Sequence, residues 1–182
     1  MAAIKYSDKY KQPNKAEFGK LNDLITDELV NLCKDKKRII IYGHAKSGKI
    51  LIAKELSRLL NFKLIVSDDY MHLGFKDAMY HIKEIAMLSN EPLIIEGVQA
   101  SRLLRKGVEL NDFFSDLIIH TEINIPSLML SYQRDGEAHK INNVINFNEK
   151  VIDKIFYEWY EIQLKYYSNK LPEIIKINTS FV

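Results

Sequence analysis

The sequence predicts an α/β protein: a three-layer sandwich in which helices cover both faces of a five-stranded parallel sheet. Short apolar runs rich in β-branched residues alternate with longer helix-forming runs, which is the pattern of parallel strands joined by helices. The 182 residues are 47% hydrophobic, which suffices for one core. Because no repeat and no Pro/Gly/Ser-rich linker divides the chain, we expect a single domain over residues 1–182.

The first elements follow from the spacing of apolar residues. Asn14 and Glu17 have the spacing of a capping box, and apolar residues then recur on one helical face, which predicts an N-terminal helix over about 15–35. The β-branched run Arg38–Tyr42 predicts a buried strand, and the apolar positions that follow predict a helix over 49–60.

The same reasoning gives the later elements. We expect strands over 62–67, 92–97, 116–123 and 173–178, helices over 75–88, 100–106 and 127–134, and a long helix from Ile152 to Tyr166. A polar segment without clear periodicity follows Arg134, and we interpret about 134–148 as a lid-like segment. Ligands of such sheets bind beyond the carboxyl ends of the strands, so the residues just after each strand are the informative ones.

The stretch YGHAKSGKILIAK contains a predicted phosphate-binding loop. Gly43, Gly48 and Lys49 have the spacing G-x-x-x-x-G-K between a predicted strand and helix, and glycines let such a loop point backbone N–H groups at phosphate oxygens. The alternative is a simple turn with a solvated lysine. The predicted nucleotide-binding residues are Gly43, His44, Ala45, Lys46, Ser47, Gly48, Lys49, Ile50 and Leu51.

Ile50 departs from this pattern, because a Ser or Thr hydroxyl normally stands there as a ligand of Mg²⁺. An isoleucine side chain cannot bind a hard cation, and Leu51 offers no substitute. Since Mg²⁺ keeps several waters and nucleotide oxygens in such sites, we expect weakened rather than abolished metal binding.

Acidic residues follow the second and third predicted strands. Asp68 and Asp69 come after the second strand, and Glu96 ends the third. Carboxylates at this edge can accept a proton from an attacking hydroxyl or hold Mg²⁺. The alternative is an ordinary helix cap at Asp68 and Asp69 and a solvated turn at Glu96.

The segments GHAKSGK, SDDYM, PLIIEGV and SYQRDG resemble, in order and spacing, the P-loop nucleoside and nucleotide kinases, most of all the uridine kinase-like branch. The resemblance covers about residues 38–178. It implies a strand order of 2-3-1-4-5, ATP as phosphoryl donor with Mg²⁺, Asp68 or Asp69 near the acceptor hydroxyl, and Glu96 near the metal. It also implies that Arg134 is the lid arginine; Lys140 or His139 are the candidates for a second lid cation.

The candidate catalytic residues are thus Lys49, Asp68, Asp69 and Arg134, and the candidate metal ligands are Glu96 and Asp68. Arg134 has an alternative role as a helix-end cation. Tyr70, beside the acidic pair, is a candidate acceptor-binding residue. Arg102 and Arg105 are further candidates, or the solvated side of a short helix.

The composition limits which binding partners we expect. Lys and Arg number 26 against 24 Asp and Glu, and this balance gives no reason to expect nucleic acid or a membrane as partner. The single Cys33 and the absence of an apolar leader favour a cytoplasmic protein. The histidines lack zinc-ligand spacing. A homodimer is compatible with the sequence.

Two functions from different classes follow. The first is an ATP-dependent kinase that transfers the γ-phosphoryl group to a hydroxyl of a small molecule, such as a nucleoside or nucleotide. The second is a nucleotide-binding regulatory protein in which Ile50 has ended efficient catalysis. The acidic set Asp68, Asp69 and Glu96 favours the enzyme, because a protein that only binds nucleotide does not need all three.

Overall fold

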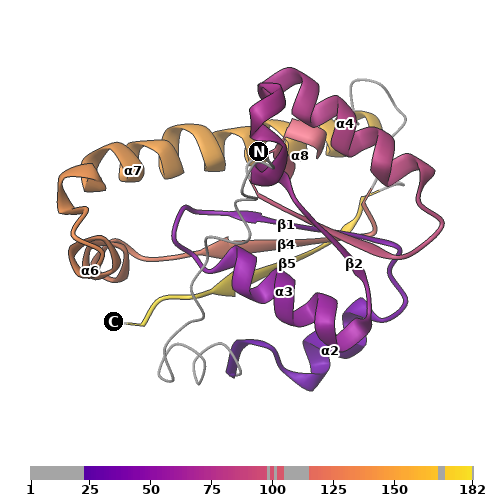
Figure 1. The fold of residues 1–182 in the computed structure, drawn as a ribbon, viewed down its shortest axis with the longest axis horizontal. Coiled ribbons are helices and arrows are strands. Elements are labelled where there is room, and N and C mark those ends of the chain that lie inside the picture. Colours follow the sequence, from indigo (N-terminus) through magenta and orange to yellow (C-terminus); the bar gives the residue numbers. More distant parts are fainter. Residues whose placement is uncertain (1–22, 98, 101, 105–114, 168–170, 182) are drawn as a thin grey trace, which may run out of the picture.

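The computed structural model describes residues 23–97, 99–100, 102–104, 115–167 and 171–181. Its centre is a parallel sheet in the order β2-β3-β1-β4-β5, which confirms the predicted fold class and strand order (Figure 1). The strands are β1 (Arg38–Gly43), β2 (Lys63–Val66), β3 (Leu93–Glu96), β4 (Leu117–Glu122) and β5 (Glu173–Asn178).

Helices cover both faces of the sheet. The α-helices are α2 (Asp27–Cys33), α3 (Lys49–Leu60), α4 (Phe75–Leu88), α6 (Ile125–Arg134), α7 (Ile141–Phe147) and α8 (Lys154–Tyr167). Shorter 3₁₀ turns are η2 (Ser67–Leu73) and η3 (Ala138–Lys140), and η4 (Asn148–Asp153) is a π-helix. Figure 1 shows α2 and α3 on one face and α4 and α8 on the other.

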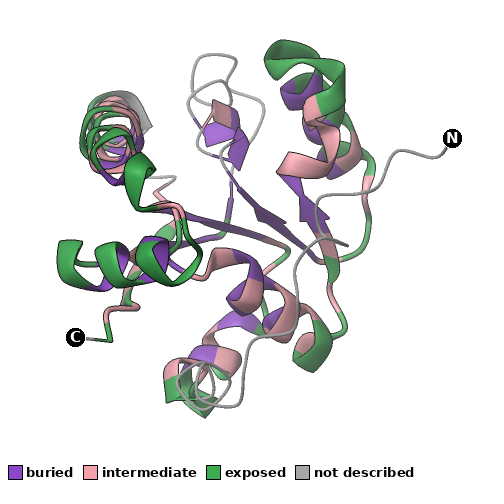
Figure 2. Cartoon of the chain, turned by 60° about the vertical axis from the view of Figure 1, so that its left-hand side comes forward, coloured by how far each residue is buried: buried purple, intermediate pink, exposed green. Residues whose placement is uncertain are grey.

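Alternate residues of a strand pack into two separate hydrophobic cores, one on each face of the sheet. In β1, Ile39 and Ile41 pack with α2 and α3, whereas Ile40 and Tyr42 pack with α4 and α8. Side chains of a strand point alternately to opposite faces, so a strand buried on both faces must be apolar at every position. Strands β1, β3 and β4 accordingly form the buried centre of the molecule (Figure 2), whereas β5, at one edge of the sheet, is partly exposed.

Two segments differ from the prediction. The expected helix over about 15–35 is interrupted at Thr26, whose hydroxyl accepts a hydrogen bond from Leu29 N–H and caps α2; Asn14 and Glu17 lie outside the described residues. The polar segment after Arg134 is largely helical, in η3 and α7, because Ile141 packs on α6 residues in a third apolar cluster.

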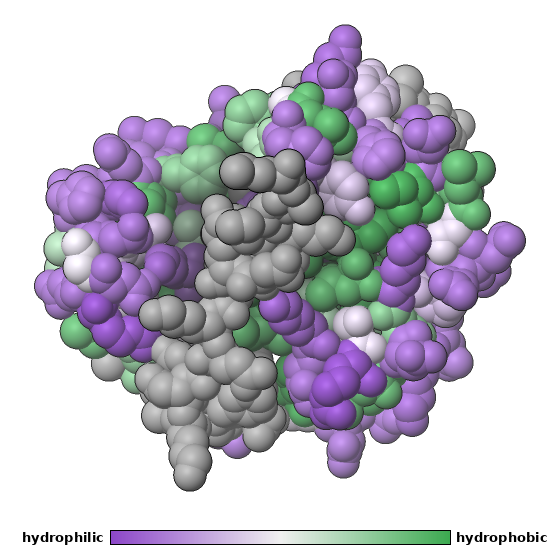
Figure 3. Space-filling view, viewed as in Figure 1, coloured by the Kyte–Doolittle hydropathy of each residue, from purple (hydrophilic) through white to green (hydrophobic). Residues whose placement is uncertain are grey.

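The end of the molecule built by α6 and α7 is predominantly hydrophilic (Figure 3). Among the described residues, no helix combines the length and apolar character that a membrane crossing needs.

Candidate functional site

The glycine-containing loop joins β1 to α3 at the carboxyl edge of the sheet. Its first residue, Gly43, pairs with Thr121 of β4, and a Cβ at Gly43 would lie 2.0 Å from the Thr121 carbonyl oxygen. The next N–H, of His44, donates to the same oxygen at 3.0 Å. The base of the loop is therefore fixed against β4, and only glycine fits there.

At its other end the loop turns into α3. Gly48 has φ 73°, a left-handed conformation, and α3 begins after it without a capping side chain. The N-terminal amides of a helix carry partial positive charge and point at any anion placed before them. This end of the loop has the geometry for binding phosphate.

Lys49 lies across this loop and faces acidic residues. Its Nζ donates to the His44 carbonyl oxygen at 2.6 Å. Burial lowers the pKa of Lys49, while the charges of Glu96 and Asp68 raise it. The lysine, the loop and two carboxylates thus share one small region.

Glu96 is the more buried of these two carboxylates, with 6% of the residue exposed. Burial raises the pKa of Glu96 to about 7, and Lys49 partly opposes the shift. Burial also raises the pKa of Asp68, again opposed by Lys49. The ends of β2 and β3 meet closely here: a Cβ at Gly97 would lie 2.1 Å from Ser67 Oγ.

The two carboxylates Glu96 and Asp68 suit Mg²⁺ better than a metal ion whose ligands all come from the protein. Within the described ranges, no three or more His, Cys, Asp or Glu side chains form a metal cluster. Mg²⁺ commonly takes only one or two carboxylates and completes its shell with water and phosphate. Glu96 and Asp68 meet that requirement.

The hydroxyl missing at position 50 is not replaced from within the loop. Ile50 is 4% exposed. The Ser47 hydroxyl is bound to the His44 carbonyl oxygen and to Thr121 Oγ1, both at 2.6 Å, so it serves the shape of the loop. Any metal at this site would rely on the carboxylates.

The other predicted residues lie around this centre. Asp69 lies beside Asp68 in the first turn of η2, and Tyr70 packs near His81, with 5.5 Å between ring centroids. Arg102 stacks on Phe75, 4.4 Å from the ring centroid.

Arg134 ends α6, where its Nε lies 3.6 Å from Asp135 Oδ1. Arg105 lies outside the described residues.

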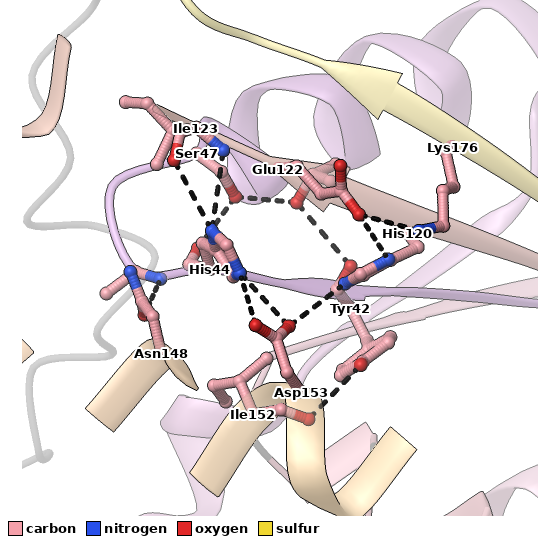
Figure 4. Close-up of polar contacts among 12 residues, drawn as sticks. Tyr42, His44, Ser47, His120, Glu122, Ile123, Asn148, Ile152, Asp153 and Lys176 are labelled. Carbon is pink, nitrogen blue, oxygen red and sulfur yellow. Dashed lines mark hydrogen bonds and ion pairs between the residues drawn. The ribbon is translucent and has the colours of Figure 1, made fainter. Parts of the chain in front are cut away.

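Sequence reasoning missed a polar network behind the loop (Figure 4). His44 Nε2 lies 3.1 Å from Asp153 Oδ1, and Ala45 N–H donates to Asn148 Oδ1 at 2.9 Å. Both partners belong to η4, more than 100 residues further along the chain. The spacing of Asn148 and Asp153 gives no signal of this contact, which depends on where η4 crosses the sheet edge.

Gln99 was also missed. It is fully buried after β3, where its N–H donates to Ser67 Oγ at 3.3 Å and its Nε2 approaches Met71 Sδ at 3.1 Å. Among the described residues, its Oε1 has no hydrogen-bond partner. Gln99 is thus a buried polar residue held against the residues that follow β2, in the same region as Asp68.

His120 of β4 is a buried histidine that lies beside this network. Its ring stacks between Tyr42 and Phe156, with centroids 4.8 and 5.1 Å away. Within the described part of the chain neither ring nitrogen has a hydrogen-bond partner, although Glu122 and Asp153 lie 3.4 and 3.9 Å away. Burial lowers the pKa of His120 to about 4, against the opposing effect of Glu122.

We expect His120→Phe to reduce the loss of stability in acid. The folded-state pKa lies below the unfolded value, so the unfolded chain takes up the proton first and stability falls as pH drops from about 6.5 towards 4. Phenylalanine keeps the ring stack and removes this term, so its advantage over the wild type should grow by about 2 kcal/mol between pH 7.5 and 5. Urea unfolding at both pH values measures it.

The exposed His139 supplies the control. His139→Gln should leave the pH dependence unchanged. Equal acid sensitivity in His120→Phe and the wild type would contradict the assignment to His120.

The comparisons with known proteins found matches among solved structures only. No protein-family model matches the chain, and no curated protein matches it. A shikimate kinase from Acinetobacter baumannii in complex with shikimate is 13% identical over 78% of this chain and 99% of its own, with a TM-score of 0.49.

Two further solved structures resemble this chain at a similarly low sequence identity. A shikimate kinase from Bacteroides thetaiotaomicron is 16% identical, covers 78% of this chain and 86% of its own, and has a TM-score of 0.43. A deoxyadenosine kinase from M. mycoides with bound dATP is 15% identical, covers 78% and 91%, and has a TM-score of 0.37. At these values the likeness identifies neither a substrate nor a family, and the proposals below rest on this chain's own residues.

Proposed function

We propose that this protein is an ATP-dependent phosphotransferase of the P-loop kinase type, which moves the γ-phosphoryl group to a hydroxyl of a small molecule. The observation that carries the proposal is the meeting of Lys49, Asp68 and Glu96 beside the loop at the carboxyl edge of the sheet. A turn that only binds phosphate needs the lysine. It gains nothing from the half-buried Asp68 and the buried Glu96.

The loop amides and Lys49 would hold the triphosphate, and Lys49 would offset the charge that develops on the transferring group. Asp68 is the better supported base of the acidic pair, because burial raises its pKa and so favours uptake of a proton, against the opposing effect of Lys49. It would accept the proton of the acceptor hydroxyl. The hydroxyl oxygen then bonds to the γ phosphorus, the bond from phosphorus to the β–γ bridging oxygen breaks, and ADP leaves.

Glu96 would hold Mg²⁺, which supplies charge neutralisation at the phosphates when bound. Asp68 is the second candidate ligand, a role that it could take only if Asp69 were the base. Tyr70 and Arg102 are proposed to line the acceptor side. Arg134, at the end of α6, is proposed to close over the donor from a lid-like segment over about 134–148. The quoted motifs favour a nucleoside or nucleotide as acceptor, through the resemblance to the uridine kinase-like branch.

ADP release from ATP and Mg²⁺, measured over a panel of nucleosides, nucleotides and other small alcohols, tests this proposal. Release above the water background with one acceptor class is expected. Ile50 favours the second candidate, a nucleotide-binding regulatory protein, which predicts ATP binding that is equal with and without Mg²⁺ and no ADP from any acceptor.

We expect Ile50→Thr to strengthen Mg²⁺ binding to the protein–ATP complex by on the order of tenfold, because it restores one oxygen ligand among about six. Titration of ATP binding against Mg²⁺ measures the change. Ile50→Val is the matched control, since valine has the shape of threonine without the hydroxyl. An equal Mg²⁺ affinity in both variants would show that the metal is held elsewhere.

A further inference from the structure

Three consecutive residues of the phosphate loop are each bound by a residue of the chain after β4: His44 by Asp153, Ala45 by Asn148 and Lys46 by Asp135. We call Asp135, Asn148 and Asp153 the clasp. Asn148 and Asp153 approach the loop from η4, as Figure 4 shows, whereas Asp135 follows α6. The clasp therefore holds the loop from two separate elements.

Asp135 differs from the other two because it contacts two cations. Its Oδ2 accepts a hydrogen bond from Lys46 Nζ, and its Oδ1 lies 3.6 Å from Arg134 Nε. The hydrogen bond from Lys46 is the main reason that the pKa of Asp135 lies below its ordinary value. Lys46 Nζ also lies 5.1 Å from the centroid of the Tyr132 ring, so the ammonium group is held on α6.

These two cations are the ones that a nucleotide would use. Lys46 stands inside the loop, and Arg134 is the proposed lid arginine. Phosphate oxygens accept hydrogen bonds from ammonium and guanidinium groups in the way that a carboxylate does. A phosphate at the loop and the Asp135 carboxylate must therefore compete for Lys46 and Arg134, and they repel each other as like charges.

We propose that Asp135 is a positioning residue that holds Lys46 and Arg134 together before nucleotide binds and releases both cations to its phosphates. This inference rests on the proposed function of the phosphate loop. The side chains of Lys46 and Asp135 are about one-third exposed, 33% and 35%. Ion pairs of this kind are weak, which suits a contact that a ligand has to break.

Asp135→Asn is expected to bind ATP about threefold more tightly than the wild type, because the competing charge is gone. Isothermal titration calorimetry at low ionic strength measures the affinity, with inorganic tripolyphosphate as a second probe that carries the charges without the base. The gain should shrink as salt is added. Most of the gain in affinity should also be lost when Asp135→Asn is made in a Lys46→Met background, because Asp135 then no longer competes with the phosphates for Lys46.

Glu173→Gln is the control. It removes the same charge from an exposed carboxylate that pairs with Lys36 at 3.1 Å, at the first residue of β5 and so at the opposite end of the sheet from the loop. It should leave both affinities unchanged. The role of Asp135 would be overturned, while the proposed function stands, if Asp135→Asn bound ATP no more tightly than a wild type that binds it, if Glu173→Gln showed the same gain, or if Asp135→Asn kept its full gain with Lys46→Met present. Failure of the wild type to bind either probe would overturn both proposals.

Discussion

Lys49→Met is expected to lower the rate of phosphoryl transfer by about 10²- to 10³-fold, the effect of removing one charged donor from a preorganised site. Methionine keeps the length of the side chain but cannot neutralise the transferring group. ADP release with the best acceptor measures the rate, and calorimetry measures the binding of ATP. The chain should stay folded, because the variant removes a charge that is costly to bury.

Lys63→Met is the matched control. Lys63 is exposed at the first residue of β2, at the opposite end of the sheet from the loop. A normal rate in this variant alongside a large loss in Lys49→Met would assign the effect to the site. A normal rate in Lys49→Met would remove the proposed donor site altogether.

The elements that sequence predicted well are those whose local pattern and tertiary environment agree. Helices α3 and α4 and strand β5 have the predicted bounds, 49–60, 75–88 and 173–178. Strands β1 and β3 are buried on both faces, and this burial is what makes their sequences continuous apolar runs. The order of the strands came only through the resemblance to P-loop kinases, because spacing along a chain does not state which strand lies beside which.

The segment from Asp135 to Asp153 shows why other parts escaped prediction. Ile141, Val144 and Ile145 pack with the buried Tyr132 of α6 in a small cluster, whereas Phe147 and Ile152 pack with the core that includes α4 and α8. This packing stabilises helices that are polar on their other sides. Helices in proteins depend on such packing more than on propensity. Ile141, Val144 and Ile145 do have the spacing of one helical face, but this pattern is short and lies among many polar residues.

The same argument applies to the candidate site. The positions of the loop, Asp68 and Glu96 were predictable because each lies at the carboxyl end of a strand, and the carboxyl ends of parallel strands meet at one edge. The partners of the loop were not, because Asn148 and Asp153 reach it across more than 100 residues. Local sequence predicts which residues end a strand, but not which distant side chain completes their hydrogen bonds.

Gly43→Ala is expected to destabilise the fold by about 4 kcal/mol. Two costs add: Gly43 has φ 147°, which disfavours alanine, and its new Cβ would lie 2.0 Å from the Thr121 carbonyl oxygen, which belongs to the backbone of β4. Backbone cannot rotate away as a side chain does, so β1 and β4 must separate or the loop must shift. Because whole domains are stable by only about 5–15 kcal/mol, urea unfolding should show a large loss.

Gly74→Ala separates the two costs. Gly74 also has a positive φ, 83°, with ψ 159°, but an added Cβ there meets nothing within 4 Å, so only the backbone cost of about 1–3 kcal/mol remains. If both variants lost the same small amount, the contact between Gly43 and β4 would not constrain the loop. A much larger loss at Gly43 would mean that the glycine-containing loop after β1 is held in place by its packing on Thr121, without any bound ligand.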